Sequence, residues 1–101
     1  MPIKRTLEER LNRYKSFSDV AFTCQSIKQA IRTFPVDAVN EGRISPRAPL
    51  SDAHKEALDM IAHKIARIVN GDPNYKDNWH DIAGYATLAE EACVGEDSEE
   101  N

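Results

Sequence analysis

The stretch from Asn70 to Ala86 constrains the fold more than any other part of the sequence. Gly71 follows a long segment of helical periodicity and is typical of a helix end, and Asp72-Pro73-Asn74 is a turn sequence. Asp77 or Asn78 can then cap a new helix. Helices joined by so short a connection run antiparallel, so the sequence predicts a helical hairpin.

Both helices of this hairpin carry an apolar stripe, in which spacings of three and four place each set of side chains on one face. In the first helix, which Ser51 caps, the stripe consists of Ala57, Leu58, Ile61, Ile65, Ile68 and Val69. In the second, which Gly95 ends, the inward positions are Trp79, Ile82, Tyr85, Ala86, Ala89 and Cys93. Gly84 lies inside the second helix, where glycine costs about 1 kcal/mol relative to alanine. We therefore expect a neighbouring helix or a ligand to approach the Gly84 backbone closely.

Two shorter helices are expected before the hairpin. Thr6 and Glu9 have the spacing of a capping box and predict a short first helix. Ser18 is expected to cap a second helix, which Pro35 ends. The sequence thus predicts an all-α fold, a small helical bundle with two shorter N-terminal helices. Its antiparallel hairpin is expected at about 51–70 and 78–94.

The segment 35–50 is proline-rich and lacks periodicity. A loop of this length in a compact domain is functional or mobile. We interpret it as a lid, a partner-contact loop or a connector. Residues 1–94 are expected to form a single domain, and the acidic tail 95–101 is expected to be disordered because it has nothing to bury.

Composition excludes some partners. With 13 Lys and Arg against 17 Asp and Glu, the net charge is −4, which argues against a direct nucleic-acid partner. No apolar run is long enough to span a bilayer, so we expect no membrane partner and a cytoplasmic location. Cys24 and Cys93 lack the spacing of a zinc site or a disulfide framework. Both fall on apolar faces, and they are expected to be buried thiols.

The first helix of the hairpin also carries a polar stripe opposite its apolar one. Its members are Asp52, Glu56, Asp59, His63, Arg67 and Asn70. Lys64 lies close to Arg67 on the helix, and this basic pair is a candidate phosphate site near the start of the facing helix, whose free amides favour an anion. Alternatively, Lys64 and Arg67 form surface ion pairs, or they are structural partners of Asp81 across the hairpin.

Glu56 and Asp59 lie one helical turn apart, a spacing that lets two carboxylates share a divalent cation. Asp81 on the facing helix is a candidate third ligand, and Mg²⁺ is the cofactor considered. The alternative is that Glu56 and Asp59 are solvated surface acids, with Asp59 pairing to His63. His63 is a weaker candidate for a general base, and no catalytic residue is assigned.

The chain resembles a small helical domain family that is found mainly in phages and prophages and has no assigned function. The resemblance rests on Tyr14 to Phe17, Glu56 to Ile68, Gly71-Asp72-Pro73 and Asn78 to Ala86. Its motif is Lys64-x-x-Arg67 followed by Asn78-Trp79-x-Asp81-Ile82-Ala83-Gly84-Tyr85. This pattern is also similar to a phage domain associated with nucleotide modification, and a phage origin implies the cytoplasm of the host cell.

More distantly, the hairpin is similar to the all-α nucleoside triphosphate pyrophosphohydrolases of the MazG group. Those enzymes hold magnesium on carboxylate pairs from two facing helices, which activates a water. The matching pairs here are Glu56-x-x-Asp59 and Asn78-x-x-Asp81, in which an amide replaces one carboxylate. The resemblance therefore implies a nucleotide ligand, and the replaced carboxylate argues against catalysis.

Three functions remain open. The first is binding of a phosphorylated small molecule, a nucleotide or nucleotide-derived signal, with Lys64 and Arg67 on the phosphate and Trp79 or Tyr85 beside the base. The second is a magnesium-dependent pyrophosphohydrolase. The third is an acidic protein that inhibits a host or defence protein through segment 35–50 or the tail. A homo-oligomer is expected in each case, because the hairpin leaves apolar surface to cover.

Overall fold

The computed structural model describes residues 16–94, and the fold of this part is all-α, as predicted. It contains three helices and no strand: α2 (Phe17–Asn40), α3 (Asp52–Asn70) and α4 (Lys76–Glu91). The helix expected at the capping box of Thr6 and the tail 95–101 lie outside the described residues. None of the three helices is long and apolar enough to cross a membrane.

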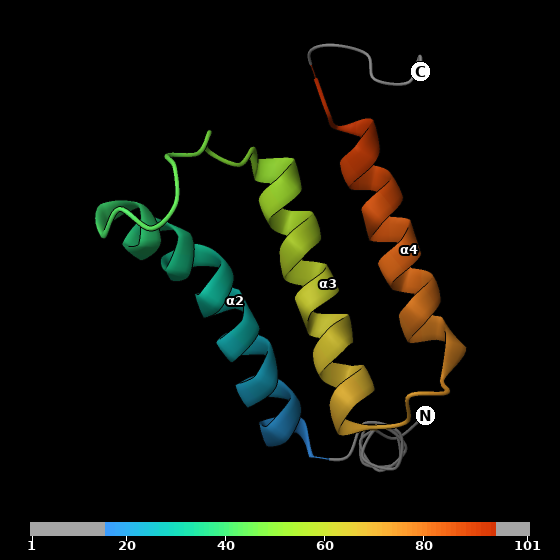
Figure 1. Cartoon of the computed structure of the whole chain (residues 1–101). Coiled ribbons are helices and arrows are strands. Elements are labelled where there is room, and N and C mark those ends of the chain that lie inside the picture. Colours follow the sequence, from blue (N-terminus) through green and yellow to red (C-terminus); the bar gives the residue numbers. More distant parts are fainter. Residues whose placement is uncertain (1–15, 95–101) are drawn as a thin grey trace.

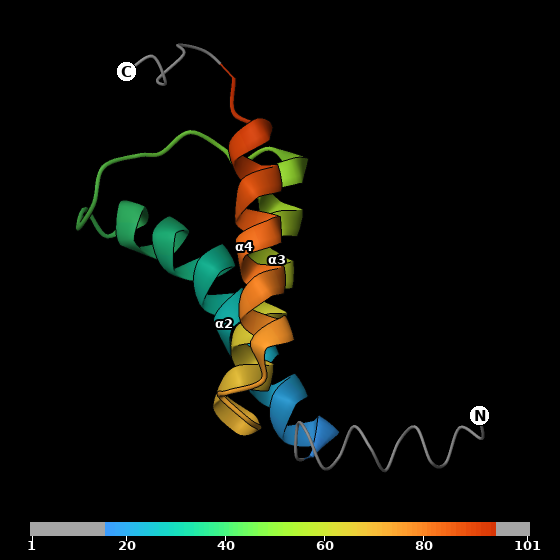
Figure 2. The ribbon, with the colours of Figure 1, turned by 90° about the vertical axis from the view of Figure 1, so that its right-hand side faces the viewer.

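The helix α3 lies between the other two. It packs against α2 on one side and α4 on the other, and it is the only one of the three that contacts both. The helices α3 and α4 run in opposite directions (Figure 1), as the hairpin prediction requires. Seen from the side, α2 leans away from α3 towards its C-terminal end, and the segment after it bridges back to the start of α3 (Figure 2).

Hydrogen bonds at the turns explain where the helices begin. Ser51 caps α3, and its Oγ accepts from the His54 amide at 3.1 Å. The cap of α2 is Ser16 rather than Ser18, because Ser16 Oγ accepts from two amides of the first turn, at 3.1 and 3.4 Å. Asp72 closes the turn before α4 by accepting from the Asn74 amide at 2.9 Å. This turn lets α4 begin at Lys76, earlier than the predicted caps Asp77 and Asn78.

The prediction that Pro35 ends the second helix is wrong. The helix α2 has 24 residues and continues through Pro35 to Asn40, so it is the longest described helix and not a short one. Ala38, in the added turn, is 1% exposed, and its carbonyl accepts from the Arg43 amide at 2.8 Å. This packing and capping offset the cost of about 3 kcal/mol that a proline imposes inside a helix. The irregular segment therefore covers 41–51 rather than 35–50.

The buried core of the described part is made mostly of small side chains. Val20 and Cys24 of α2 cluster with Ala66 of α3, which is 0% exposed. Of the apolar stripe predicted for α3, Ala57 and Ile68 are buried, whereas Val69 is 64% exposed. The apolar stripe of α3 faces the neighbouring helices over only part of its width, and this explains the difference.

Three of the inward positions predicted for the second helix of the hairpin lie at its surface, namely Trp79, Ala86 and Cys93. Trp79 is 55% exposed, and its Nε1 donates to the carbonyl of Pro73 at 2.8 Å. Its ring therefore folds back over the turn between α3 and α4 instead of entering the core. Cys24 is buried as predicted, but Cys93 is exposed because α4 ends at Glu91, before reaching it.

Candidate functional site

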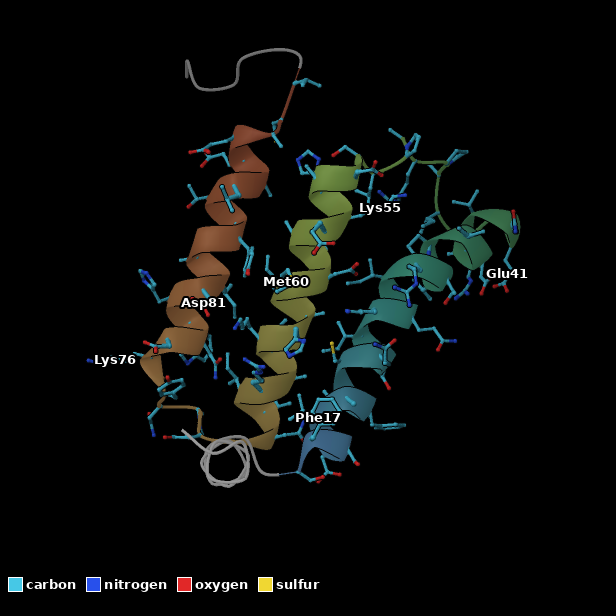
Figure 3. The ribbon with its side chains drawn as sticks, turned by 180° about the vertical axis from the view of Figure 1, so that it is seen from behind. Phe17, Glu41, Lys55, Met60, Lys76 and Asp81 are labelled. Atoms are coloured by element: carbon cyan, nitrogen blue, oxygen red, sulfur yellow. The ribbon has the colours of Figure 1, made fainter. Side chains whose placement is uncertain are left out.

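Lys64, predicted as a phosphate ligand, is held by an acid across the hairpin. Its Nζ lies 3.0 Å from Oδ2 of Asp81, and the two side chains are 13% and 41% exposed. Asp81 lies on the part of α4 that runs beside α3 (Figure 3). The structural interpretation of Lys64 as a partner of Asp81 is therefore confirmed. A phosphate at this position would have to displace Asp81.

The other cation of the predicted pair, Arg67, lies in the last turn of α3. Burial lowers the pKa of His63 below its ordinary value, and the nearby charges of Arg67 and then Lys64 lower it further. The neutral form of the His63 imidazole is therefore favoured near pH 7.

The two aromatic residues proposed beside the base are separated. Tyr85 lies one turn after Asp81 on α4 and is half-buried. Trp79 lies two residues before Asp81, which places it about 160° around the helix from that carboxylate. The structure thus puts Tyr85 on the same side of α4 as the Lys64–Asp81 pair and Trp79 on the other.

The predicted magnesium ligands are not gathered into one site. Glu56 is exposed, Asp59 lies 4.0 Å from Arg32 of α2, and Asp81 is paired with Lys64. No group of three or more His, Cys, Asp and Glu side chains in residues 16–94 is arranged to hold a metal ion.

Asn78, which replaces a carboxylate in the MazG-type pattern, is 1% exposed. Its Nδ2 finds no hydrogen-bond partner, which costs about 1–3 kcal/mol. This position therefore offers no surface ligand to a cation.

Gly84 also differs from expectation. A Cβ placed on Gly84 would meet no atom within 4 Å, and the residue is exposed. No neighbouring helix approaches this backbone within residues 16–94, so the expected helix contact is not made in the described part of the chain.

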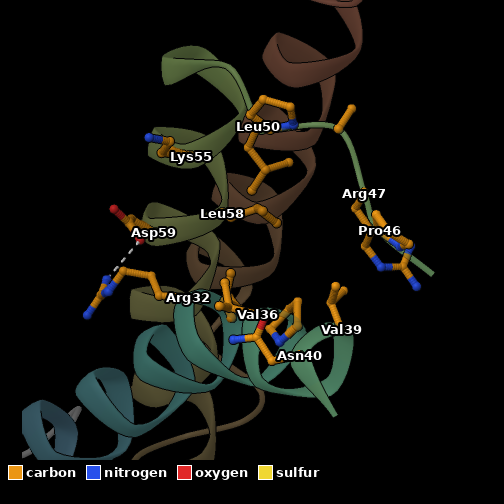
Figure 4. Close-up of a pocket in the computed structure, with 14 residues that line it drawn as sticks. Arg32, Val36, Val39, Asn40, Pro46, Arg47, Leu50, Lys55, Leu58 and Asp59 are labelled. Carbon is orange, nitrogen blue, oxygen red and sulfur yellow. Dashed lines mark ion pairs between the residues drawn. The ribbon is translucent and has the colours of Figure 1, made fainter. Parts of the chain in front are cut away.

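A pocket of about 880 Å³ opens between the C-terminal half of α2, the segment 41–51 and the start of α3. Leu50 and Leu58 lie above Val36 and Val39 in Figure 4 and form much of its wall together with Ile31 and the prolines. The pocket exists because α2 leans away from α3 at this end (Figure 2). We call it the interhelical pocket.

The charges of the interhelical pocket are mainly positive. Arg32, Arg47 and Lys55 line it, against the single acid Asp59, which pairs with Arg32. Arg47 lies on the opposite side of the apolar wall from this ion pair in Figure 4. Neither Arg47 nor Lys55 forms an ion pair with an acid of the described residues. The sequence pointed to this segment as a lid or contact loop but not to these cations.

A second group that the sequence did not predict joins the start of α3 to the end of α4. His54 Nδ1 lies 2.7 Å from Ser51 Oγ, and Nε2 lies 2.9 Å from the carbonyl oxygen of Ala89. Cys93 Sγ lies 3.6 Å from the same Nε2. His54 and Cys93 lie at nearly the same distance in sequence before and after Pro73. In an antiparallel hairpin this spacing brings two residues together, so the contact could have been predicted from the sequence.

Comparison with known proteins gives a family but no activity. No curated protein and no solved structure matches the chain. A phage origin and the likeness to the MazG group stay predictions. A family model described as a domain of unknown function (DUF6378) matches residues 12–93. Because the match spans most of the sequence, the chain belongs to this family, DUF6378.

Proposed function

We propose that this protein binds a phosphorylated small molecule with an apolar body, of the size of a nucleotide, in the interhelical pocket. The observation that carries the proposal is the combination of an apolar wall with cations on two sides of it. A volume of about 880 Å³ lies within the range of small-molecule sites, roughly 300–1,000 Å³.

The lining chemistry supports an anionic ligand over a neutral one. Arg47 and Lys55 lack an acidic partner within residues 16–94, so an anion would gain their charge without displacing a carboxylate. Arginine also offers a planar fork of donors that matches phosphate. The base or other apolar body would lie against Leu58, Val36 and Val39.

This proposal keeps the ligand class expected from the sequence but moves the phosphate away from Lys64. At Lys64 a phosphate competes with Asp81 at 3.0 Å, whereas at Arg47 it meets no such competitor. The nucleotide identity of the ligand remains part of the proposal.

The test is a binding screen against nucleoside mono-, di- and triphosphates, by thermal shift and equilibrium dialysis. Arg47→Ala and Lys55→Ala should each weaken binding by about tenfold or more, because a hydrogen bond to a charged group contributes about 1.5–3 kcal/mol. Lys76→Ala is the matched control: it removes one positive charge from an exposed position on α4 and should leave the affinity unchanged.

Three outcomes would count against this assignment. Binding that survives both pocket variants but is lost in the double variant of Lys64 and Arg67 would return the site to the α3–α4 hairpin. The absence of any nucleotide binding would reject the proposal. Pyrophosphate release that Glu56→Gln abolishes would instead establish the MazG-type activity.

A second candidate, docking of a partner protein, is favoured by the exposed large apolar side chains. They occur on all three described helices and include Phe22, Val69, Trp79 and Leu88. Large exposed apolar patches mark interaction surfaces. Replacing Trp79 and Val69 with glutamate, which should leave the buried core intact, would abolish co-purification of such a partner or self-association in light scattering.

A further inference from the structure

Three donor atoms of different chemistry meet where the start of α3 contacts the end of α4. They are Nε2 of His54, Sγ of Cys93 and the carbonyl oxygen of Ala89. The separations are 3.6 Å between Nε2 and Sγ, 3.5 Å between Sγ and the carbonyl oxygen, and 2.9 Å between Nε2 and that oxygen. Cys93 is exposed, so the group is accessible from solvent.

These separations are close to those that one tetrahedral metal ion imposes. With Zn–S near 2.3 Å and Zn–N or Zn–O near 2.0–2.1 Å, tetrahedral angles place sulfur about 3.6 Å from the nitrogen or oxygen ligand. The two distances that involve Cys93 Sγ match this spacing. The nitrogen and oxygen would be about 3.4 Å apart in such a site, so the imidazole has to move by about half an ångström to admit the ion.

We propose that His54 and Cys93 bind Zn²⁺ or a similar borderline-soft divalent cation, with the Ala89 carbonyl as a third protein ligand and water in the fourth position. Imidazole and thiolate are the ligands that zinc prefers in proteins, and they disfavour Mg²⁺. The site is separate from the interhelical pocket, and it does not depend on the function proposed there.

Ser51 would fix the imidazole from its other side. A metal-bound histidine almost always donates its second ring N–H to an oxygen, which orients the ring. Ser51 Oγ lies 2.7 Å from Nδ1 and is in place to accept that hydrogen bond. Without the metal, Nε2–H donates to the Ala89 carbonyl and the Ser51 hydroxyl donates to Nδ1.

Metal binding changes the protonation of His54 and Cys93. The imidazole moves its one proton from Nε2 to Nδ1, and the Ser51 hydroxyl changes from donor to acceptor. Cys93 loses its thiol proton to solvent, because only the thiolate is a metal ligand. One proton is therefore released for each ion bound.

Co²⁺ titration of the full chain under reducing conditions tests the proposal. Co²⁺ substitutes for Zn²⁺, and a thiolate ligand gives a strong near-ultraviolet charge-transfer band. We expect this band in the natural protein, its bleaching by added Zn²⁺ and the release of one proton per ion. Cys93→Ser should abolish the band, and His54→Gln should weaken Co²⁺ binding by at least about tenfold.

Matched controls separate the site from other histidine and thiol binding. Cys24→Ser removes the buried cysteine of α2, and His80→Ala removes an exposed histidine of α4; neither should change the band. The variant His54→Gln keeps a side-chain donor for the Ala89 carbonyl, so loss of binding there does not reflect loss of the fold. A band that is absent, or that survives both Cys93→Ser and His54→Gln, would show that the group serves only as a hydrogen-bonded clamp.

Discussion

Gly84→Ala should make this protein more stable. Gly84 lies in the middle of α4, which spans Lys76–Glu91, and glycine inside a helix is about 1 kcal/mol less favourable than alanine. The added methyl group meets no atom within 4 Å, so there is no steric cost to set against this gain. We expect the free energy of unfolding to rise by about 0.5–1 kcal/mol.

Thermal and urea unfolding followed by circular dichroism measure this change. For a domain of this size, 1 kcal/mol corresponds to a rise in Tm of about 4–8 °C. Ala83→Gly, at the adjacent exposed position of the same helix, is the reciprocal control and should lower the free energy of unfolding by a similar amount.

A lower Tm for Gly84→Ala would refute the reasoning, because it would mean that something fills the space above this backbone in solution. If the Tm of Gly84→Ala falls only at high protein concentration, the group that fills this space is a second copy of the chain. If Gly84→Ala is more stable but loses a ligand or partner, the close approach expected from the sequence belongs to that partner and not to the fold.

Three further predictions follow from the packing and the charges. Ala66→Leu should lower the free energy of unfolding by about 1–3 kcal/mol in urea titrations, because Ala66 is fully buried against Cys24 and a larger side chain overpacks this contact. His54→Ala should lower it by about 1 kcal/mol, since the hydrogen bond between His54 Nε2 and the Ala89 carbonyl is lost; an unchanged urea midpoint would contradict this. Burial and then the nearby cations lower the pKa of His63 in the folded state, whereas the pKa in the unfolded state is about 6.5. The free energy of unfolding should therefore fall as the pH drops from about 6.5 through the lower pKa of the folded state. His63→Gln should flatten that pH profile in melting scans, and an unchanged profile would count against it.

The features that could be predicted from the sequence depend on local hydrogen bonds and on the register of the hairpin. Ser51 caps α3 through an amide three residues away, and Gly71 ends the same helix. The Lys64–Asp81 pair was also foreseeable as one alternative, because an antiparallel hairpin brings together residues at equal distances from its turn. These predictions needed only helical geometry and the position of one turn.

The features that could not be predicted depend on contacts between distant residues. Pro35 is a helix breaker by local rules, and α2 continues past it because Ala38 is buried and its carbonyl accepts from the Arg43 amide. The cations Arg47 and Lys55 belong to different segments, and their common pocket depends on the angle at which α2 leaves α3 (Figure 2). No periodicity in a single sequence encodes that angle.

The exposed apolar side chains and the interhelical pocket have one structural cause. In the part of the chain that the structure describes, only α3 has helices on two sides, and α2 and α4 each rest on α3 alone. An amphipathic pattern shows which face of a helix is apolar, but not how many neighbours cover it. Trp79 of α4 is therefore exposed although it belongs to a predicted apolar stripe. Where α2 leans away from α3, the same lack of a covering helix leaves Leu58 beside open space, with Arg47 across it. A fold with so much uncovered apolar surface favours ligands and partners that bury this surface. The cations that line the interhelical pocket favour an anionic ligand there.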